Sequence, residues 1–208
     1  MINTPPASIS KYHHGDLRSQ LIEATTELMK QGGVGAVSLR KIAEKAGVSR
    51  TAPYHHFSDK NDLLAAVAEQ GFSTLTNQLR EAIENQSLSL LQRLEQSIQG
   101  YIRFAVENST QYDLMFGSEL WRVKPSERLQ RTAKDSFRQY AGLIASFAEQ
   151  GLLSNGEDPL RLAQLMWAAL HGLVKLTHDG IFVRTEDLEE ISRYAVSKLT
   201  QMMYGIIY

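Results

Sequence analysis

The chain has 208 residues, of which 43% are hydrophobic and 22% charged, and it contains no cysteine. This length can bury a sizeable core, as one domain or as a small domain followed by a larger one, and the lack of cysteine excludes disulfides and thiolate chemistry. The polar amino end has no apolar signal segment, and no apolar run approaches the ~20 residues of a membrane span. We therefore expect a cytoplasmic protein without a membrane partner.

The formal net charge is only −1, but the charges are unevenly distributed. Residues 1–60 hold eight basic and five acidic side chains, whereas the remainder holds fourteen and eighteen. Four of the six histidines also lie in the first segment. Attraction to phosphates is therefore concentrated at the amino end.

Residues 1–14 are predicted to form a flexible arm. Its basic side chains could touch a phosphate backbone, although a solvated tail is the simpler and favoured explanation. The pair His13 and His14 is too isolated from carboxylates to indicate a metal site. A first helix is expected to begin at Gly15 and to stop at Gly32 and Gly33. Its inward stripe would consist of Leu17, Leu21, Ala24, Thr25 and Leu28.

The stretch from Ser38 to Phe57 predicts two short helices joined by a tight turn. Ser38 is a good N-cap, and apolar residues follow it at helical spacing. Gly47 stands where a left-handed residue after the first helix suits glycine. We expect Ser49 to cap the second helix. Because Pro53 then falls at the fourth position of this helix, we expect a slightly bent helix of about two turns.

Such a pair is either a structural element of an all-α protein or a DNA-binding helix-turn-helix motif. In the DNA-binding form, the second helix lies in the major groove with its N-terminal residues toward the bases. Arg50 and Thr51 occupy those positions here, with Tyr54 and His55 one turn later. Because arginine offers paired donors to guanine, we expect Arg50 to contact bases, with Thr51 beside it.

Three segments, LRKIAEKAGVS, YHHF and SDKNDLL, together with the helices before and after them, resemble the TetR family of bacterial transcription regulators from about Leu17 to Leu64. The variant TAPYHHF and the preceding HHGDLR are similar to one subgroup of that family. Pro53 departs from the family pattern, which typically has alanine, glycine, an aromatic residue or threonine there. The resemblance implies a DNA-binding domain over residues 15–62, with phosphate contacts from Ser38, Arg40, Ser49, Tyr54, His55 and Lys60.

The remaining residues, 63–208, predict an effector-binding and dimerisation domain made only of helices. Ser58 is expected to cap a long helix that runs to about Asn85, ~37 Å at 1.5 Å per residue. Further amphipathic helices are predicted over 87–107, from Pro125 to Gly151, from Asp158 to His178, and from a cap at Thr185 to about Met202. The chain shows no strand pattern, so the predicted fold class is all-α, a three-helix helix-turn-helix domain joined by a long helix to a helical bundle.

Large apolar and aromatic residues gather in this second part, most densely from Tyr112 to Trp121. They either form an ordinary hydrophobic core or line an apolar cavity into which a few polar side-chain atoms point. The pattern Trp167, His171 and Gly172 resembles the Trp…His-Gly type of TetR effector domain. The predicted ligand-binding residues are Tyr101, Phe104, Met115, Phe116, Trp121, Phe137, Tyr140, Trp167 and His171.

No motif in the chain indicates catalysis, and no cofactor or metal is expected. The apolar stripes of the last two helices favour a homodimer closed by a four-helix bundle. We therefore predict a ligand-responsive repressor that binds double-stranded DNA at a palindromic operator and answers to a small, mainly apolar effector. The alternative is an all-α small-molecule-binding or isomerase-like protein in which the helix pair is only structural.

Overall fold

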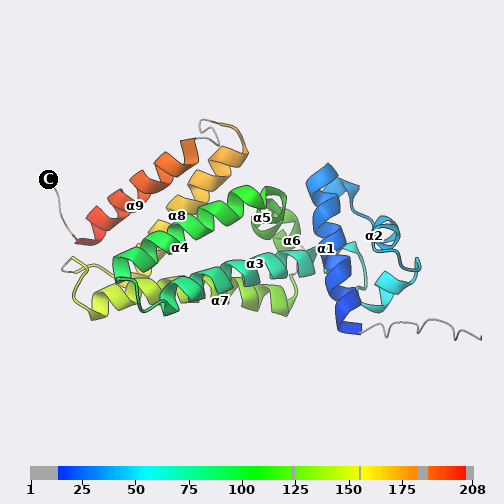
Figure 1. Ribbon diagram of the computed structural model, residues 1–208, viewed down its shortest axis with the longest axis horizontal. Coiled ribbons are helices and arrows are strands. Elements are labelled where there is room, and N and C mark those ends of the chain that lie inside the picture. Colours follow the sequence, from blue (N-terminus) through cyan, green and yellow to red (C-terminus); the bar gives the residue numbers. More distant parts are fainter. Residues whose placement is uncertain (1–13, 123–124, 155, 182–186, 205–208) are drawn as a thin grey trace, which may run out of the picture. The chain divides into compact units, whose positions relative to one another are not determined.

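The computed structural model describes residues 14–122, 125–154, 156–181 and 187–204, and every regular element in these ranges is a helix (Figure 1). The predicted all-α fold class is thereby confirmed. The chain divides into two compact units, Met1–Val67 and Ala68–Tyr208. The division falls within helix α3 (Lys60–Glu84), which therefore contributes residues to both units. None of the helices described is long and apolar enough to cross a membrane.

The first unit is built from α1 (His14–Gly32), the 3-10 turn η1 (Val34–Ala36), α2 (Leu39–Lys45), the 3-10 turn η2 (Ala52–His55) and the start of α3. Helix α2 contacts both α1 and η2. The predicted stripe of α1 is buried at Leu21, Ala24 and Thr25, whereas Leu17 and Leu28 are half-buried. Of the expected arm at residues 1–14, the first thirteen residues lie outside the described part of the chain, and His14 is the first residue of α1.

Helix α2 begins and ends as its sequence predicts. The Ser38 hydroxyl accepts a hydrogen bond from the Lys41 amide at 3.3 Å. Gly47 has a φ of 66°, in the left-handed region that favours glycine. The Val48 amide then donates to the Ala43 carbonyl and the Gly47 amide to the Glu44 carbonyl, the paired bonds of a Schellman motif. The tight turn between the two helical segments is therefore fixed by local hydrogen bonds.

The second segment of the pair differs from the prediction. It is one 3-10 turn, η2, rather than a bent α-helix of two turns, and Ser49 does not cap it, because its hydroxyl pairs with that of Thr51 at 3.2 Å. The physical reason is Pro53, which has no amide proton to donate to the carbonyl four residues back. The segment closes instead through three-residue bonds, from the Ala52 amide to the Ser49 carbonyl and from the Tyr54 amide to the Thr51 carbonyl.

The start of α3 also corrects the prediction, since Asp59 and not Ser58 is the cap. The Asp59 carboxylate accepts from the Asp62 amide at 2.8 Å, and the Asp62 carboxylate accepts from the Ser58 amide at 2.9 Å. The Ser58 hydroxyl is already used, because it donates to the same Asp62 carboxylate. This reciprocal pair of bonds satisfies two amides that the helix itself leaves without partners.

The second unit contains the rest of α3 and six further helices in the described residues: α4 (Leu90–Glu107), α5 (Ser109–Phe116), α6 (Ser118–Arg122), α7 (Glu127–Glu149), α8 (Pro159–His178) and α9 (Leu188–Tyr204). Helix α7 packs along α8, and α4 contacts α5, α7, α8 and α9 (Figure 1). The fully buried side chains include Ile98, Tyr112, Met115, Leu143 and Phe147. The core of this unit therefore lies between α4, α5, α7 and α8.

The helix starts of this unit follow the sequence with one correction. Asp158 is the N-cap of α8, where that helix was expected to begin, with Pro159 at its first position. Ser126 is the N-cap of α7, one residue after the predicted start at Pro125. Helix α4, however, begins three residues later than expected, because Ser89 and Gln92 form a capping box while the Ser87 hydroxyl bonds to the Asn85 side chain. The predicted cap at Thr185 falls outside the described residues.

Candidate functional site

Of the eight predicted DNA-contacting residues, six lie on α2, on η2 or on the loop between them, Ser38 precedes α2, and Lys60 begins α3. Six of them are exposed: Arg40, Ser49, Arg50, Thr51, Tyr54 and His55. Tyr54 keeps 60% of its surface exposed even though it is a large aromatic residue. In the same turn Pro53 is buried, and Phe57 just after it is 1% exposed. The apolar residues of this segment thus anchor it, and its polar and aromatic ones face solvent.

The two other predicted residues have intramolecular partners. The Ser38 hydroxyl is the N-cap of α2, and the Lys60 ammonium donates to the Val34 carbonyl at 2.9 Å. Lys60 keeps two further N–H donors, since an ammonium carries three. Lys41, which follows Arg40 on α2 and is exposed, was not predicted. Its charge is the one signal that marks it in the sequence.

Two contacts support this surface from α1. The Arg18 guanidinium lies 5.2 Å from the centre of the Phe57 ring, over the residue that ends the helix pair. The Lys45 ammonium and the Glu27 carboxylate pair at 2.7 Å and join the end of α2 to α1. Glu27 is largely exposed, so this ion pair adds little stability, but it holds the end of α2 in place.

The predicted ligand-binding residues of the second unit are brought together as ring contacts. Trp167 of α8 meets Tyr101, Phe137 and Tyr140 edge-on, at centroid distances of 5.4, 5.7 and 5.4 Å. A second group is centred on Phe116, whose ring lies 4.6 Å from that of His171 and 5.3 Å from that of Phe72.

The other three predicted residues lie around these groups. The Trp121 ring lies 6.5 Å from the ring of Phe72, and its indole nitrogen donates to the Met115 carbonyl at 2.8 Å. Met115 is fully buried, and Phe104 of α4 is 3% exposed. Eight of the nine residues are thus linked by ring contacts or by the bond from Trp121 to Met115, whereas Phe104 is established only as buried.

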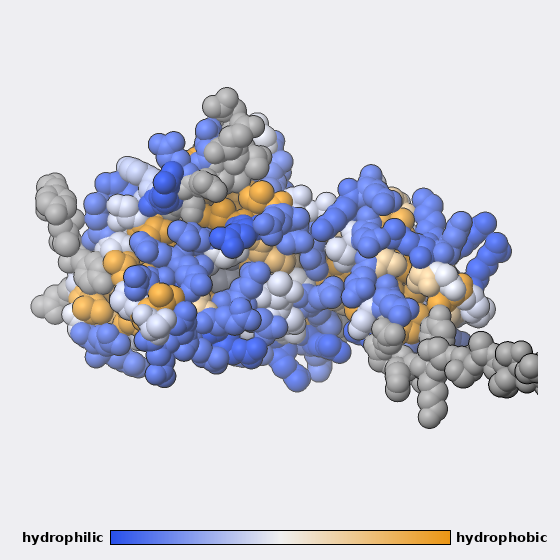
Figure 2. All heavy atoms as spheres, viewed as in Figure 1, coloured by the Kyte–Doolittle hydropathy of each residue, from blue (hydrophilic) through white to orange (hydrophobic). Residues whose placement is uncertain are grey.

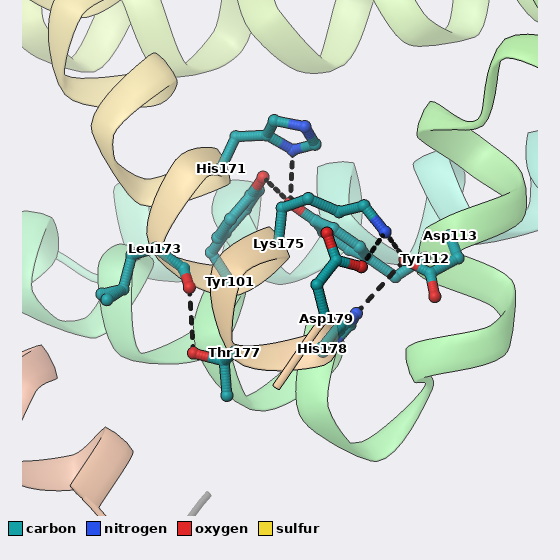
Figure 3. A network of polar contacts seen from close by, with 9 residues as sticks. All are labelled: Tyr101, Tyr112, Asp113, His171, Leu173, Lys175, Thr177, His178 and Asp179. Carbon is teal, nitrogen blue, oxygen red and sulfur yellow. Dashed lines mark hydrogen bonds and ion pairs between the residues drawn. The ribbon is translucent and has the colours of Figure 1, made fainter. Parts of the chain in front are cut away.

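A chain of short hydrogen bonds crosses this region (Figure 3). The hydroxyls of Tyr101 and Tyr112 are 2.6 Å apart, and the Tyr112 hydroxyl lies 2.6 Å from Nδ1 of His171. Burial lowers the pKa of His171, with the Lys175 charge acting in the same direction, so the neutral imidazole is favoured. Burial also raises the pKa of Tyr112 far above its usual value, which keeps this hydroxyl protonated. Tyr112 can therefore donate to His171 while it accepts from Tyr101.

Tyr112 is the functional candidate that the sequence prediction missed. It is fully buried and stands at the centre of the hydrogen-bond chain, with its ring stacked on that of His171 at 5.6 Å. Its place in the aromatic stretch 112–121 was the available signal. The partner on another helix, 59 positions away, is what the sequence could not show.

A group of charged side chains borders the chain of hydrogen bonds at the end of α8 (Figure 3). The Asp113 carboxylate of α5 lies 3.3 Å from the Lys175 ammonium and 3.3 Å from Nδ1 of His178. Lys175 also pairs with Asp179 at 2.8 Å, and this hydrogen bond is the main reason that its pKa is raised. These contacts attach α5 to the last turn of α8.

The second unit contains a small cavity of about 40 Å³ between α3, α4, α7 and α8. Of the nine predicted residues, Tyr101, Tyr140 and Trp167 line it. Trp121 and Phe137 line instead an open groove of about 430 Å³ beside Lys134 and Arg138. Ligand sites usually measure ~300–1,000 Å³, so the cavity in this conformation is far smaller than a site for a whole effector.

The fold and these two regions define a class of protein, a DNA-binding regulator with a helix-turn-helix unit and a separate helical unit. The family model for bacterial regulatory proteins of the tetR family matches residues 21–67. The model for the tetracyclin repressor-like C-terminal domain matches residues 94–199, half of the chain. The chain belongs to the TetR family of transcriptional regulators. This confirms the family expected from the sequence and excludes the isomerase-like alternative.

Curated relatives agree with this assignment over part of their length. The chain is 31% identical over 102 residues to the HTH-type transcriptional activator FasR of Mycolicibacterium smegmatis, which is 49% of this chain and 46% of FasR. It is 47% identical over 64 residues to the HTH-type transcriptional regulator BetI of Pseudomonas aeruginosa, 31% of this chain and 32% of BetI. The chain thus spans only 32–46% of the length of these relatives.

Solved structures share the fold over almost the whole chain. A protein of unknown function from Rhodococcus sp. RHA1 is 27% identical, with a TM-score of 0.81 over 94% of this chain and 100% of that one. The regulator FadR of Bacillus subtilis, solved in complex with stearoyl-CoA, is 17% identical, with a TM-score of 0.69 over 88% of this chain and 98% of that one. At that identity the second likeness concerns the fold alone.

Proposed function

We propose that the chain is a ligand-responsive repressor that binds a palindromic operator as a homodimer in the cytoplasm. The observation that carries this proposal is the η2 turn, which buries Pro53 and exposes Arg50, Thr51, Tyr54 and His55 beside α2. Exposed polar residues on the second segment of a helix-turn-helix are placed to enter the major groove. Residues 15–62 would form the DNA-binding domain and residues 63–208 the effector-binding and dimerisation domain.

Within this surface, Arg50 and Thr51 would read bases and the other residues would contact phosphates. Arg50 is exposed and precedes the η2 turn, and its guanidinium can bond guanine with two parallel N–H groups. Arg40, Ser49, Tyr54 and His55 are exposed around it. Ser38 and Lys60 would contact the sugar-phosphate backbone of the DNA. Lys60 would use the N–H groups of its ammonium that do not donate to the Val34 carbonyl. Phosphate contacts set affinity and register, whereas base contacts set specificity.

The proposed dimer would use the exposed sides of α8 and α9. Leu160 and Leu165 of α8 are 48% and 54% exposed, and Tyr194 of α9 is 64% exposed. Ala168 and Ala169 lie exposed on α8 as well, and small residues allow helices to approach closely. Figure 2 shows hydrophobic residues at the surface where α8 and α9 lie. A two-fold pairing of these helices would present two copies of η2 to a palindromic site.

Control by an effector would pass through α3. This helix lines the cavity with Leu75 and Thr76, and it begins at Lys60 within the DNA-binding unit. Because the cavity measures only about 40 Å³, a mainly apolar effector with one or two hydrogen-bonding groups must separate its walls. A ligand shifts DNA affinity by its differential affinity for two arrangements of the protein. Moving α3 relative to α4, α7 and α8 would supply that difference.

The test is selection of binding sites from random duplexes, followed by titration of the selected site. We expect a palindromic sequence, a stoichiometry of two chains per site and an affinity that falls steeply with salt. A selected site without two-fold symmetry, or a monomer by sedimentation at micromolar concentration, would contradict the dimer. Binding that is insensitive to salt and sequence would contradict the whole proposal.

A further inference from the structure

One buried polar group on the cavity of the second unit lacks a hydrogen-bond partner in the described part of the chain. The Tyr140 hydroxyl is buried and has no hydrogen-bond partner among the residues described, and the side chain is only 4% exposed. By contrast, the Tyr101 hydroxyl, on the same cavity, bonds to Tyr112, and the Ser136 hydroxyl bonds to the Phe72 carbonyl. A buried hydroxyl without a partner costs about 1–3 kcal/mol, so the site favours a molecule that brings one.

The lining of the cavity also limits the charge of such a molecule. Among the described residues that line it there is no Asp, Glu, Lys, Arg or His, and the polar ones are hydroxyl, amide and indole groups. Burying an unpaired charge in such surroundings costs several kcal/mol. Burial raises the pKa of Tyr140 above its usual value, so its hydroxyl stays protonated and can donate. The cavity therefore suits a hydrogen-bond acceptor without charge.

Resting on the effector-binding role proposed above, we propose that this cavity binds the polar end of an uncharged apolar effector, a ketone, ester or lactone, whose carbonyl accepts from the Tyr140 hydroxyl. Trp167 would report the event, because its ring lies 5.4 Å from that of Tyr140 and lines the same cavity. The rest of the effector would lie between helices that it has separated. The proposal thus names the chemical class of the ligand and the atom that recognises it.

The expected preference for an uncharged ligand is tested with two probes of equal length, 2-decanone and decanoate, at neutral pH. Binding is followed by calorimetry and by fluorescence of the full chain with Trp121→Phe, so that Trp167 is the one remaining tryptophan. We expect 2-decanone to bind and to change the emission, and decanoate to bind at least about 100-fold more weakly, because its charge finds no partner. Equal binding of the two probes would overturn the uncharged class.

The role of the hydroxyl is tested by Tyr140→Phe, which removes one oxygen and keeps the ring. We expect 2-decanone to bind roughly two- to tenfold more weakly, the net value of one hydrogen bond. If Tyr140→Phe left this affinity unchanged, the hydroxyl would be a core group, satisfied by water alone, and the proposal would fail. The duplex titration is run on the same samples. If DNA binding is intact but both probe tests fail, this inference is wrong, whereas the proposed DNA-binding function is unaffected.

The location is tested with a pair of glycines in helices. A Cβ placed on Gly100, which lines the cavity, or on Gly142, on the exposed side of α7, meets nothing within 4 Å. Both changes to alanine should therefore raise helix stability similarly, by up to ~1 kcal/mol. Gly100→Ala adds a methyl group to the cavity and should weaken 2-decanone binding, whereas Gly142→Ala should not. Equal probe affinity in the two variants would place the ligand elsewhere.

Discussion

The two units of the chain hold their functional groups in opposite ways. In the first unit they are exposed, and the bonds that shape the helix pair join residues two to five positions apart, as in the Ser38 cap and the Gly47 turn. In the second unit they are buried, and the decisive bonds join different helices, as between Tyr112 and His171 or between Ser136 and Phe72. In the proposed function, DNA contact would therefore depend on surface chemistry, and effector response would depend on core packing.

The largest expected effect separates two tyrosines. Tyr112 is fully buried with two hydrogen-bonded neighbours, so Tyr112→Ala should lower the free energy of unfolding by about 3–5 kcal/mol. Tyr54 is 60% exposed, so Tyr54→Ala should change stability by no more than about 0.5 kcal/mol. Urea unfolding measures both values, and duplex titration should show weaker binding for Tyr54→Ala. Similar losses of stability in the two variants would mean that Tyr54 of η2 is packed against the protein rather than exposed to solvent.

The second prediction concerns two exposed arginines. Arg50→Ala should cost roughly 1–3 kcal/mol of discrimination between the selected operator and a variant with one guanine replaced. Arg40→Ala should weaken binding to both duplexes alike and reduce the salt slope by about one, because a phosphate contact is lost. Anisotropy titrations on both duplexes at several salt concentrations measure these quantities. The assignment is wrong if the two variants show the same preferences and slopes.

The third prediction tests how closely helices meet in the second unit. A Cβ on Gly71 of α3 would lie 2.3 Å from Sδ of the fully buried Met115, so α3 and α5 approach each other there without room for a methyl group. Gly71→Ala should destabilise the protein by about 1–2 kcal/mol net, despite the better helix propensity of alanine. The loss of stability is measured by thermal unfolding of the Gly71→Ala variant, with the Gly142→Ala variant as the comparison. A stabilised Gly71→Ala variant would show that this contact yields easily.

The same contrast explains what the sequence could predict. The helix starts at Ser38 and Asp158 and the turn at Gly47 were predicted correctly, because the bonds that form them join residues a few positions apart. The all-α class followed from helical periodicity. The form of η2 was mispredicted although Pro53 was recognised, because the length of so short a helix depends on a single missing amide.

The proposed effector region was only partly predictable, for a related physical reason. Composition showed that aromatic residues cluster, and the structure brings Tyr101, Tyr140 and Trp167 to one cavity. It places Trp121 and Phe137 on a separate groove, because rotation of each helix about its axis decides which side faces inward. Tyr112 was missed for the same reason. Contacts between helices that are far apart in the chain produce no local sequence pattern from which they could be predicted.

The smallest expected effect is a pH dependence that arises in the buried chain of hydrogen bonds. Burial lowers the pKa of His171 in the folded protein, with Lys175 and His178 acting in the same direction and Asp113 opposing them. Below a pH of about 6.5, the usual histidine pKa, the unfolded chain binds a proton that the folded chain resists. The stabilising contribution of neutral His171 is therefore complete above that pH and is lost as the pH falls toward the folded pKa. Urea unfolding at pH 7.5 and 5.5 should show a smaller loss of stability for His171→Gln than for the unaltered chain, whose other titrating groups are the same. An equal loss in both proteins would mean that folding does not shift the pKa of His171. A larger loss for His171→Gln would mean that the folded protein holds the imidazole protonated, donating to Tyr112, which would reverse the direction of the hydrogen-bond chain.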